Sequence, residues 1–416
     1  MSEQAGKGRS FEWWMISFIA AGAGWAAFIS LLIPPFVTES TGNAADAGIV
    51  MAIISLAAVL APVLGGFADK YRAHRLVLTL GVLGMALGFL MYSVSAETKA
   101  IYALDAIILG VSLAAMNAVG PVFVLGANLS QELEARRLTI LNLLQPVGQV
   151  IGGALLSAAV AANLDFSTRF LIAAVFMLIS GVFTWFTTAE PAKRIVLQED
   201  RPEDLQEEQK QSFGLKQVLF SNFGILLLML TLSSMGNNGI NAQIANILPN
   251  VYGMDAQTTS ALISLAGLFN IFLFIVAGRW MARSGGMTVQ TAAQVIRFVG
   301  ALGMALVGMV SNAPILIAAA FMQILYQSNP FSRLSQGVVG MRFTLIPAGA
   351  TSGWVIAASA AGSFLGSLIG GFLASSIGFN AINWMAAIAV GIALLLMIFF
   401  LWPAERKIRA AESESG

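Results

Sequence analysis

Long apolar stretches almost free of charge constrain this chain more than any other feature. Charged residues make up only 10% of its 416 residues, and the mean hydropathy is +0.81. A helix needs roughly 20 apolar residues to cross the ~30 Å hydrocarbon core of a bilayer, because lipid offers no hydrogen-bond partners to an unpaired backbone. Runs of that length recur to nearly the last residue, so we expect an all-α membrane protein.

Hydropathy predicts twelve transmembrane helices, six on either side of one polar stretch. The predicted spans are 13–36, 46–67, 75–95, 100–124, 138–161, 168–188, 218–240, 257–281, 289–310, 313–331, 350–375 and 379–402. The polar stretch at 189–216 carries mixed charges and two prolines, and such charge runs usually stay in water. We therefore predict an N-terminal six-helix bundle at 1–188, a cytoplasmic linker at 189–216 and a C-terminal six-helix bundle at 217–416.

Basic residues predict the orientation, because Lys and Arg in short loops resist translocation. All but three of the 22 Lys and Arg residues fall on one side of the predicted spans. Lys99 and Arg169 fall on the other side, and Arg297 lies inside the ninth span, where we expect it to snorkel from a peripheral helix. The prediction is a monomeric protein of a bacterial inner membrane with both termini in the cytoplasm.

The composition excludes several kinds of chemistry. Cysteine is absent, which excludes disulfides, thiol chemistry and cysteine–metal sites. The single histidine, His74, is predicted in a cytoplasmic loop, which leaves no His-based metal cluster or buried triad. No phosphate-binding Gly-rich Lys loop is present, and a net charge of +1 suggests no nucleic-acid partner. We expect no enzyme activity, no metal and no cofactor.

The two halves of the chain share an internal repeat, which is typical of transporters with pseudo-twofold symmetry. Late in the fifth span, 148–157 reads GQVIGGALLS, and late in the eleventh, 366–375 reads GSLIGGFLAS. Glycines four residues apart clear one helix face, so that backbones can approach and slide. Static close packing and a moving interface are both open interpretations of these glycines.

The loop between the second and third spans carries a recognisable motif. Residues 65–75 read GGFADKYRAHR, which resembles the loop signature of the major facilitator superfamily at Gly65, Asp69, Lys70 and Arg75. Arg72 stands where the signature has its second glycine. The corresponding loop of the second half, 278–286, is similar at Gly278 and Arg283 but has Ala282 in place of the acid.

This resemblance implies two six-helix bundles that rock about a central cavity lined by spans 1, 4, 7 and 10. In the family the acid of the first loop lies against the start of span 11 and helps to close the cytoplasmic side. A carboxylate at a helix N-terminus meets unpaired amides and the positive end of the dipole. Asp69 is therefore a candidate gate residue, and the alternative is an ordinary solvated aspartate. The fourth and fifth spans depart from the family's drug/proton antiporter motifs, for instance at Ala106.

Asp105 is the one acidic residue well inside a predicted span. Ionisable residues at such depth are costly and usually face a cavity or a partner. Because no histidine is available in the membrane, Asp105 is the best candidate for proton coupling. The alternative is an aspartate near the outer mouth that simply reaches water.

Uncharged polar and aromatic side chains concentrate in the spans expected to line the cavity, and amides would be expensive facing lipid. The predicted substrate contacts are Trp25, Asn117, Gln145, Gln149, Asn237, Asn238, Asn241, Gln323, Tyr326 and Gln327. For each amide, hydrogen bonding between packed helices is an open alternative. Such a site suits a neutral polar solute, such as a sugar, or a drug-like efflux substrate.

These observations predict a secondary transporter that moves a small organic solute by alternating access, coupled to protons. The rival from another class is a transport-inactive scaffold or assembly factor on the same fold, because fold does not fix function. An intramembrane enzyme would need a constellation of catalytic groups that the sequence lacks.

Overall fold

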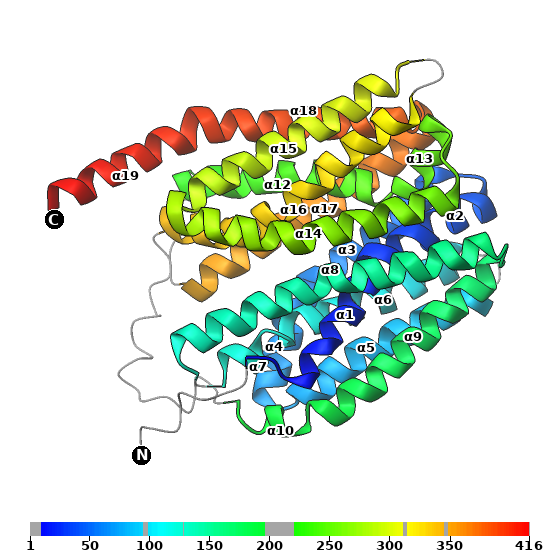
Figure 1. Ribbon diagram of the computed structural model, residues 1–416, viewed down its shortest axis with the longest axis horizontal. Coiled ribbons are helices and arrows are strands. Elements are labelled where there is room, and N and C mark those ends of the chain that lie inside the picture. Colours follow the sequence, from blue (N-terminus) through cyan, green and yellow to red (C-terminus); the bar gives the residue numbers. More distant parts are fainter. Residues whose placement is uncertain are drawn as a thin grey trace. The chain divides into compact units, whose positions relative to one another are not determined.

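A computed structural model describes residues 10–94, 99–127, 129–195, 220–310, 314–344 and 348–415 (Figure 1). These residues form helices joined by turns, and they include no strand. Eleven of the helices in the described part of the chain are long and apolar enough to cross a membrane. The predicted all-α membrane fold is therefore confirmed.

The first six spans lie close to their predicted ranges, although the first two contain several helical segments each. In chain order the elements are η2 (Trp13–Ile16), α1 (Ser17–Gly22), η3 (Ala23–Ile29), α2 (Ser30–Thr41), α3 (Ala44–Leu56), η4 (Ala57–Leu60), α4 (Ala61–Lys70), α5 (His74–Val94), α6 (Lys99–Val119), α7 (Val122–Leu125), α8 (Gln131–Ala161), α9 (Phe166–Thr187) and α10 (Ala189–Ala192). Most of the predicted linker, 196–216, lies outside the described residues.

The second half begins again at residue 220. Its elements are α12 (Asn222–Asn241), α13 (Ile244–Tyr252), α14 (Ala256–Ser284), α15 (Gly286–Val307), α16 (Ile315–Phe343), α17 (Ala348–Ser376), α18 (Asn380–Leu396), η8 (Met397–Leu401) and α19 (Trp402–Ser415). The separate helix α13 follows the seventh span and was not predicted.

Helix α16 corrects the predicted end of the tenth span. The expected range stopped at residue 331, next to Pro330, but the helix continues through that proline to Phe343. A proline removes only one backbone donor, and neighbouring helices can satisfy the freed carbonyl in a membrane protein. The helix is 29 residues long, which is enough to span, although its polar residues keep it out of the eleven most apolar helices. With α16 the count approaches the predicted twelve.

The contacts divide the chain into two compact units. Unit 1 comprises the described residues within 10–42, 56–195 and 256–268, and unit 2 comprises those within 43–55, 220–255 and 269–415. Each unit therefore includes the first part of a span whose remainder belongs to the other unit: α3 joins unit 2, and the start of α14 joins unit 1. The division of the chain at the linker stays a prediction.

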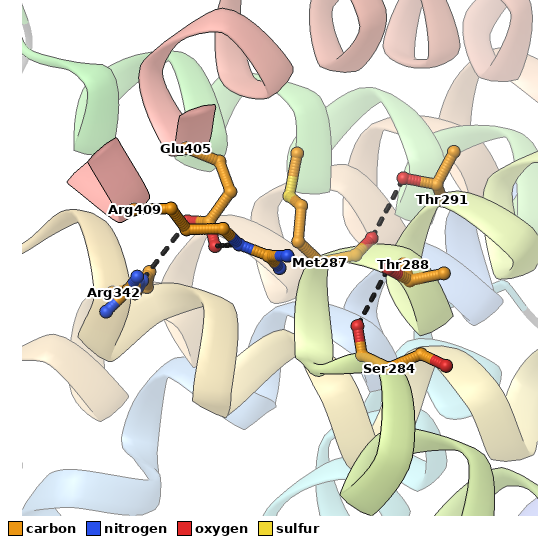
Figure 2. A network of polar contacts seen from close by, with 7 residues as sticks. All are labelled: Ser284, Met287, Thr288, Thr291, Arg342, Glu405 and Arg409. Atoms are coloured by element: carbon orange, nitrogen blue, oxygen red, sulfur yellow. Dashed lines mark hydrogen bonds and ion pairs between the residues drawn. The ribbon is translucent and has the colours of Figure 1, made fainter. Parts of the chain in front are cut away.

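An ion-pair cluster anchors the last helix of unit 2. Helices α18, η8 and α19 follow one another without a break, and they form the long red helix of Figure 1. Glu405 of α19 is only 3% exposed. Its carboxylate accepts from Arg342 Nε at 3.1 Å and from Arg409 Nε at 2.7 Å (Figure 2). Two cations thus hold one buried carboxylate where α16 ends.

A similar cluster closes the start of unit 1. Glu12 lies just before η2, and its Oε1 atom is 2.8 Å from Arg137 Nη2 and 3.0 Å from Arg194 Nη1. Trp14 Nε1 donates to the other carboxylate oxygen at 3.0 Å. Arg137 is buried, so this carboxylate connects the first element of the unit with α8 and with the segment after α10.

Candidate functional site

The predicted polar residues of unit 2 lie on α12 and α16. Asn237, Asn238 and Asn241 are half-buried on α12. Asn238 Nδ2 donates to Ser363 Oγ of α17 at 2.6 Å and to its own helix at Ser234 O. This amide therefore connects two helices, which is the packing role left open by the sequence.

On α16 the three predicted residues differ in exposure. Tyr326 is 6% exposed, whereas Gln323 and Gln327 are half-buried. The Oε1 atom of Gln327 is buried without a hydrogen-bond partner among the described residues. A buried acceptor without a donor is uncommon and costs free energy. The Oε1 atom of Gln327 could therefore accept a hydrogen bond from a solute.

Four predicted residues belong to unit 1. Trp25 is half-buried within η3, a seven-residue π-helical segment, and π-bulges occur frequently at functional sites. Asn117 is exposed on α6, and Gln145 is half-buried on α8. Gln149 is buried, and its Nε2 atom donates to the carbonyl oxygen of Ile263 at 3.0 Å. Gln149 thus serves helix packing in this structure.

The repeat glycines make equivalent close contacts in the two units. A Cβ added to Gly148 would lie 2.0 Å from the Ile19 carbonyl oxygen on α1, and one added to Gly366 would lie 2.1 Å from that of Met235 on α12. Spans 5 and 11 therefore touch spans 1 and 7 backbone to backbone. Only glycine permits such an approach.

The next pair of equivalent glycines is Gly153 in unit 1 and Gly371 in unit 2. Gly153 packs against the start of α14, and Gly371 packs against α3. A Cβ on Gly153 would meet Ser264 Oγ at 2.2 Å, and one on Gly371 would meet the Gly48 Cα at 2.6 Å. A side-chain amide supports this packing in unit 2, where Gln243 Nε2 donates to the Ala44 carbonyl oxygen at 3.1 Å. The repeat thus builds matching helix crossings twice.

The predicted gate loop is ordered by its own side chains. Asp69 Oδ1 lies 2.8 Å from His74 Nε2, with the aspartate side chain 54% exposed and the histidine side chain 4% exposed. Arg72, at the position of the expected glycine, has a left-handed φ of 50°, a conformation that glycine adopts at little cost. The residue type departs from the family motif, although the backbone here has a conformation that favours glycine.

The remaining gate candidates lie at the surface of their units. Arg75 stacks its guanidinium 3.8 Å from the centre of the Trp185 ring and donates from Nε to the carbonyl oxygen of that residue. Lys70 and Arg283 are exposed. Neither Gly65 nor Gly278 has an atom within 4 Å of an added Cβ, so packing does not require glycine at either position.

Asp105 does not reach water. It is 0% exposed on α6, and neither carboxylate oxygen has a hydrogen-bond partner among the described residues. The rings of Tyr92 and Tyr102 stack 6.0 Å apart, and Tyr92 is close enough to Asp105 to interact electrostatically. A carboxylate in such surroundings is expensive to keep charged, and protonation removes that cost.

The sequence interpretation missed a polar cluster in the middle of unit 2, and its prediction for Arg297 is wrong. Arg297 is 5% exposed and donates to Ser233, Ser328 and Asn329 on α12 and α16. It does not snorkel, because α15 turns this face toward its neighbours. The available signal was the spacing of Gln290, Gln294 and Arg297, which places three polar side chains on one helix face.

Unit 2 also contains an open groove of about 1020 Å³, lined mostly by apolar residues of α12, α13, α17 and α18. None of the predicted substrate contacts lines it, so we do not assign it to the candidate site. Within the described ranges, no three His, Asp or Glu side chains gather in a way that could hold a metal ion.

Comparisons with solved structures identify the fold. The nucleoside transporter NupG superposes with a TM-score of 0.68 at 16% identity, covering 93% of this chain and 97% of that one. The xylose transporter XylE from E. coli, in a partially occluded inward-open conformation, gives a TM-score of 0.67 at 14% identity, covering 93% and 96%. A search of curated proteins found no match.

A family comparison goes further than fold. The family model described as Major Facilitator Superfamily matches residues 14–348, which is most of the chain and includes the motif loops of both halves. The resemblance first noted at Asp69 is thereby confirmed, and the chain belongs to the Major Facilitator Superfamily.

Proposed function

We propose that this transporter moves a small polar organic solute across a bacterial inner membrane by alternating access, coupled to protons. Membership of the superfamily makes the chain a multi-pass membrane transporter rather than an enzyme. The nucleoside and xylose transporters of similar fold carry neutral polar solutes, which is one of the two solute classes predicted from the sequence.

The matching glycine contacts of the two units carry the proposal. Alternating access needs two structurally similar halves whose helices can shift against one another. Where helices cross at glycines, few interlocked side chains oppose such a shift. Gly153 and Gly371 occupy equivalent repeat positions and both contact a segment of a divided span. The scaffold alternative requires no such repetition.

For proton coupling we propose Asp105. Its burial without a partner favours a carboxyl that exchanges a proton when solvent reaches it. Replacement by asparagine mimics the protonated acid, so Asp105→Asn should abolish accumulation driven by a pH gradient. Counterflow exchange should survive, because exchange needs the conformational change but no net protonation.

For the cytoplasmic gate we propose Asp69. In the structure its partner is His74, and its approach to the start of span 11 stays a prediction from the family motif. Asp69→Asn should lower the transport rate strongly while expression stays normal, because it removes a charge and not a packing contact. Full transport by this variant in liposomes would make Asp69 an ordinary surface residue.

The experiment begins with a thermal-shift screen of the purified protein against nucleosides, sugars, amino acids and drug-like compounds. A ligand that binds only the folded state must stabilise it. The stabilising compound is then used in liposomes with an imposed pH gradient, with Asp105→Asn beside the wild type. Gradient-driven transport by the variant at the wild-type level would exclude Asp105, and a wild type that never transports any stabilising compound would favour the scaffold.

A further inference from the structure

Arg297 occupies the middle of a membrane-spanning helix. It is the twelfth of the 22 residues of α15, so at 1.5 Å per residue it lies about 15 Å from either helix end. Its side chain is 5% exposed. A guanidinium cannot lose its proton in a protein, and a charge held at this depth requires compensation.

The partners of this guanidinium are all neutral. Its Nη1 atom donates to Ser233 Oγ on α12, its Nε to Ser328 Oγ on α16 at 3.1 Å, and its Nη2 to Asn329 Oδ1 at 3.3 Å. These bonds use three of the five N–H donors of an arginine. They satisfy part of its hydrogen-bonding capacity and none of its charge.

No carboxylate lies on α12, α15, α16 or α18, the helices around Arg297. No Asp or Glu occurs between Asp255 and Glu405, and the one acidic residue of α3 in unit 2, Asp46, lies in the first turn of that helix. Asp255 precedes α14, and Glu405 already pairs with two arginines in the network of Figure 2. A buried cation is normally paired with an anion, and the helices packed around Arg297 carry no acidic residue to supply one.

A second donor lies beside Arg297 without an acceptor. Gln294, three residues earlier on α15, is 0% exposed. Its Oε1 accepts from Ser233 Oγ at 2.8 Å, while its Nε2 has no hydrogen-bond partner among the described residues. Because Ser233 accepts from Arg297 and donates its only hydrogen to Gln294, these contacts orient the amide. The surroundings therefore hold more donors than acceptors.

We propose that Ser233, Gln294, Arg297, Ser328 and Asn329, the Arg297 cluster, bind one small anionic group. The group is either an inorganic anion such as chloride or a carboxylate carried by the transported solute, since both offer the acceptors and the charge that the cluster lacks. Asn329 is half-buried, so the cluster is not fully enclosed by its own unit. Transporters bind their substrates near the bilayer midplane, and the Arg297 cluster lies in the middle of its spans.

The carboxylate source deepens the proposed transport function and rests on it, whereas the chloride source does not. A binding measurement that needs no transport separates the two ideas. The purified full chain is titrated with sodium chloride, and separately with sodium acetate, against the sodium salt of a bulky sulfonate at constant ionic strength, and its thermal unfolding is followed.

The expected result is a saturable rise of the apparent melting temperature with one or both small anions, as for any ligand of the folded state. Arg297→Gln should weaken the apparent affinity at least tenfold, and Arg297→Lys, which keeps the charge, should weaken it less. Arg279→Gln removes a charge from an exposed site on α14 and should respond like the wild type. A rise with chloride alone assigns an inorganic anion, and a rise with acetate alone assigns a carboxylate.

Two results would overturn the inference: a wild-type protein that neither anion stabilises beyond the bulky sulfonate, or an equal response from Arg297→Gln. If Arg297→Gln does not fold, Gln294→Leu supplies the second test. It removes the unpaired Nε2 donor and also the oxygen that accepts from Ser233, while the three residues that accept from Arg297 are unchanged, and it should weaken anion binding several-fold. An unchanged affinity in Gln294→Leu would likewise count against the proposal.

Discussion

The close crossing of α12 and α17 makes Gly366→Ala a sharp test of the packing described above. A Cβ at this position would lie 2.1 Å from the Met235 carbonyl oxygen, whereas ordinary contact begins at 3.4 Å, so the helices must part by about 1.3 Å, the difference between those distances. The obstacle is backbone and not a flexible side chain, so no rotamer change can relieve it.

Overpacking of this kind costs roughly 1–3 kcal/mol, and the higher helix propensity of alanine returns about 1 kcal/mol. We therefore expect a net loss of up to about 2 kcal/mol in the free energy of unfolding of unit 2, and a fall in Tm of about 2–4 °C per kcal/mol. The assay is thermal unfolding of the purified protein at one scan rate.

Gly353→Ala is the matched control, because Gly353 lies on the same helix and has no atom within 4 Å of an added Cβ. That variant should keep or raise the Tm through helix propensity alone. If Gly366→Ala melts at or above the temperature of Gly353→Ala, the backbone contact does not limit stability and our reasoning about the repeat glycines fails.

Three further outcomes are expected. Glu405→Gln should cost about 1–3 kcal/mol of stability, because it removes the buried negative charge between two arginines and replaces one of the two acceptor oxygens with an NH2 donor; a Tm equal to that of the wild type would refute this. Asp165 caps α9 by accepting from the Thr168 amide, and hydrogen bonds from the Thr168 side chain and from that amide lower the pKa of the exposed carboxyl. A carboxyl whose pKa is lower in the folded state stabilises the fold at pH values above its unfolded-state pKa of about 3.9, and this stabilisation is lost as the pH falls through the folded-state pKa. Asp165→Ala should therefore lower the Tm near neutral pH, and the difference in Tm from the wild type should shrink below about pH 4. A difference in Tm that does not change with pH would contradict the charge argument. Asn238→Ala should weaken solute binding by about 1–3 kcal/mol if its amide turns from Ser363 to the solute, and an unchanged Kd beside a lowered Tm would assign Asn238 to packing alone.

The sequence by itself determined the membrane fold and the family. Hydropathy is a local property of some twenty residues, so it located the spans without knowledge of their neighbours. The loop motif at Gly65 and Asp69 is likewise local, and it identified the superfamily that the family comparison later confirmed. The repeat between 148–157 and 366–375 is also visible in the sequence without the structure, because duplication preserves the spacing of the glycines.

Only the tertiary structure decided which way the polar side chains face. The hydropathy of Arg297 is the same whether its side chain points to lipid, to water or to a neighbouring helix. In the structure it points to α12 and α16, which supply hydroxyl and amide hydrogen-bond acceptors in the middle of unit 2. The same holds for Pro330, which is unfavourable inside a helix but lies within α16 in the structure. The physical reason is that the facing of a helix in a bundle is set by packing between helices, which no single segment encodes.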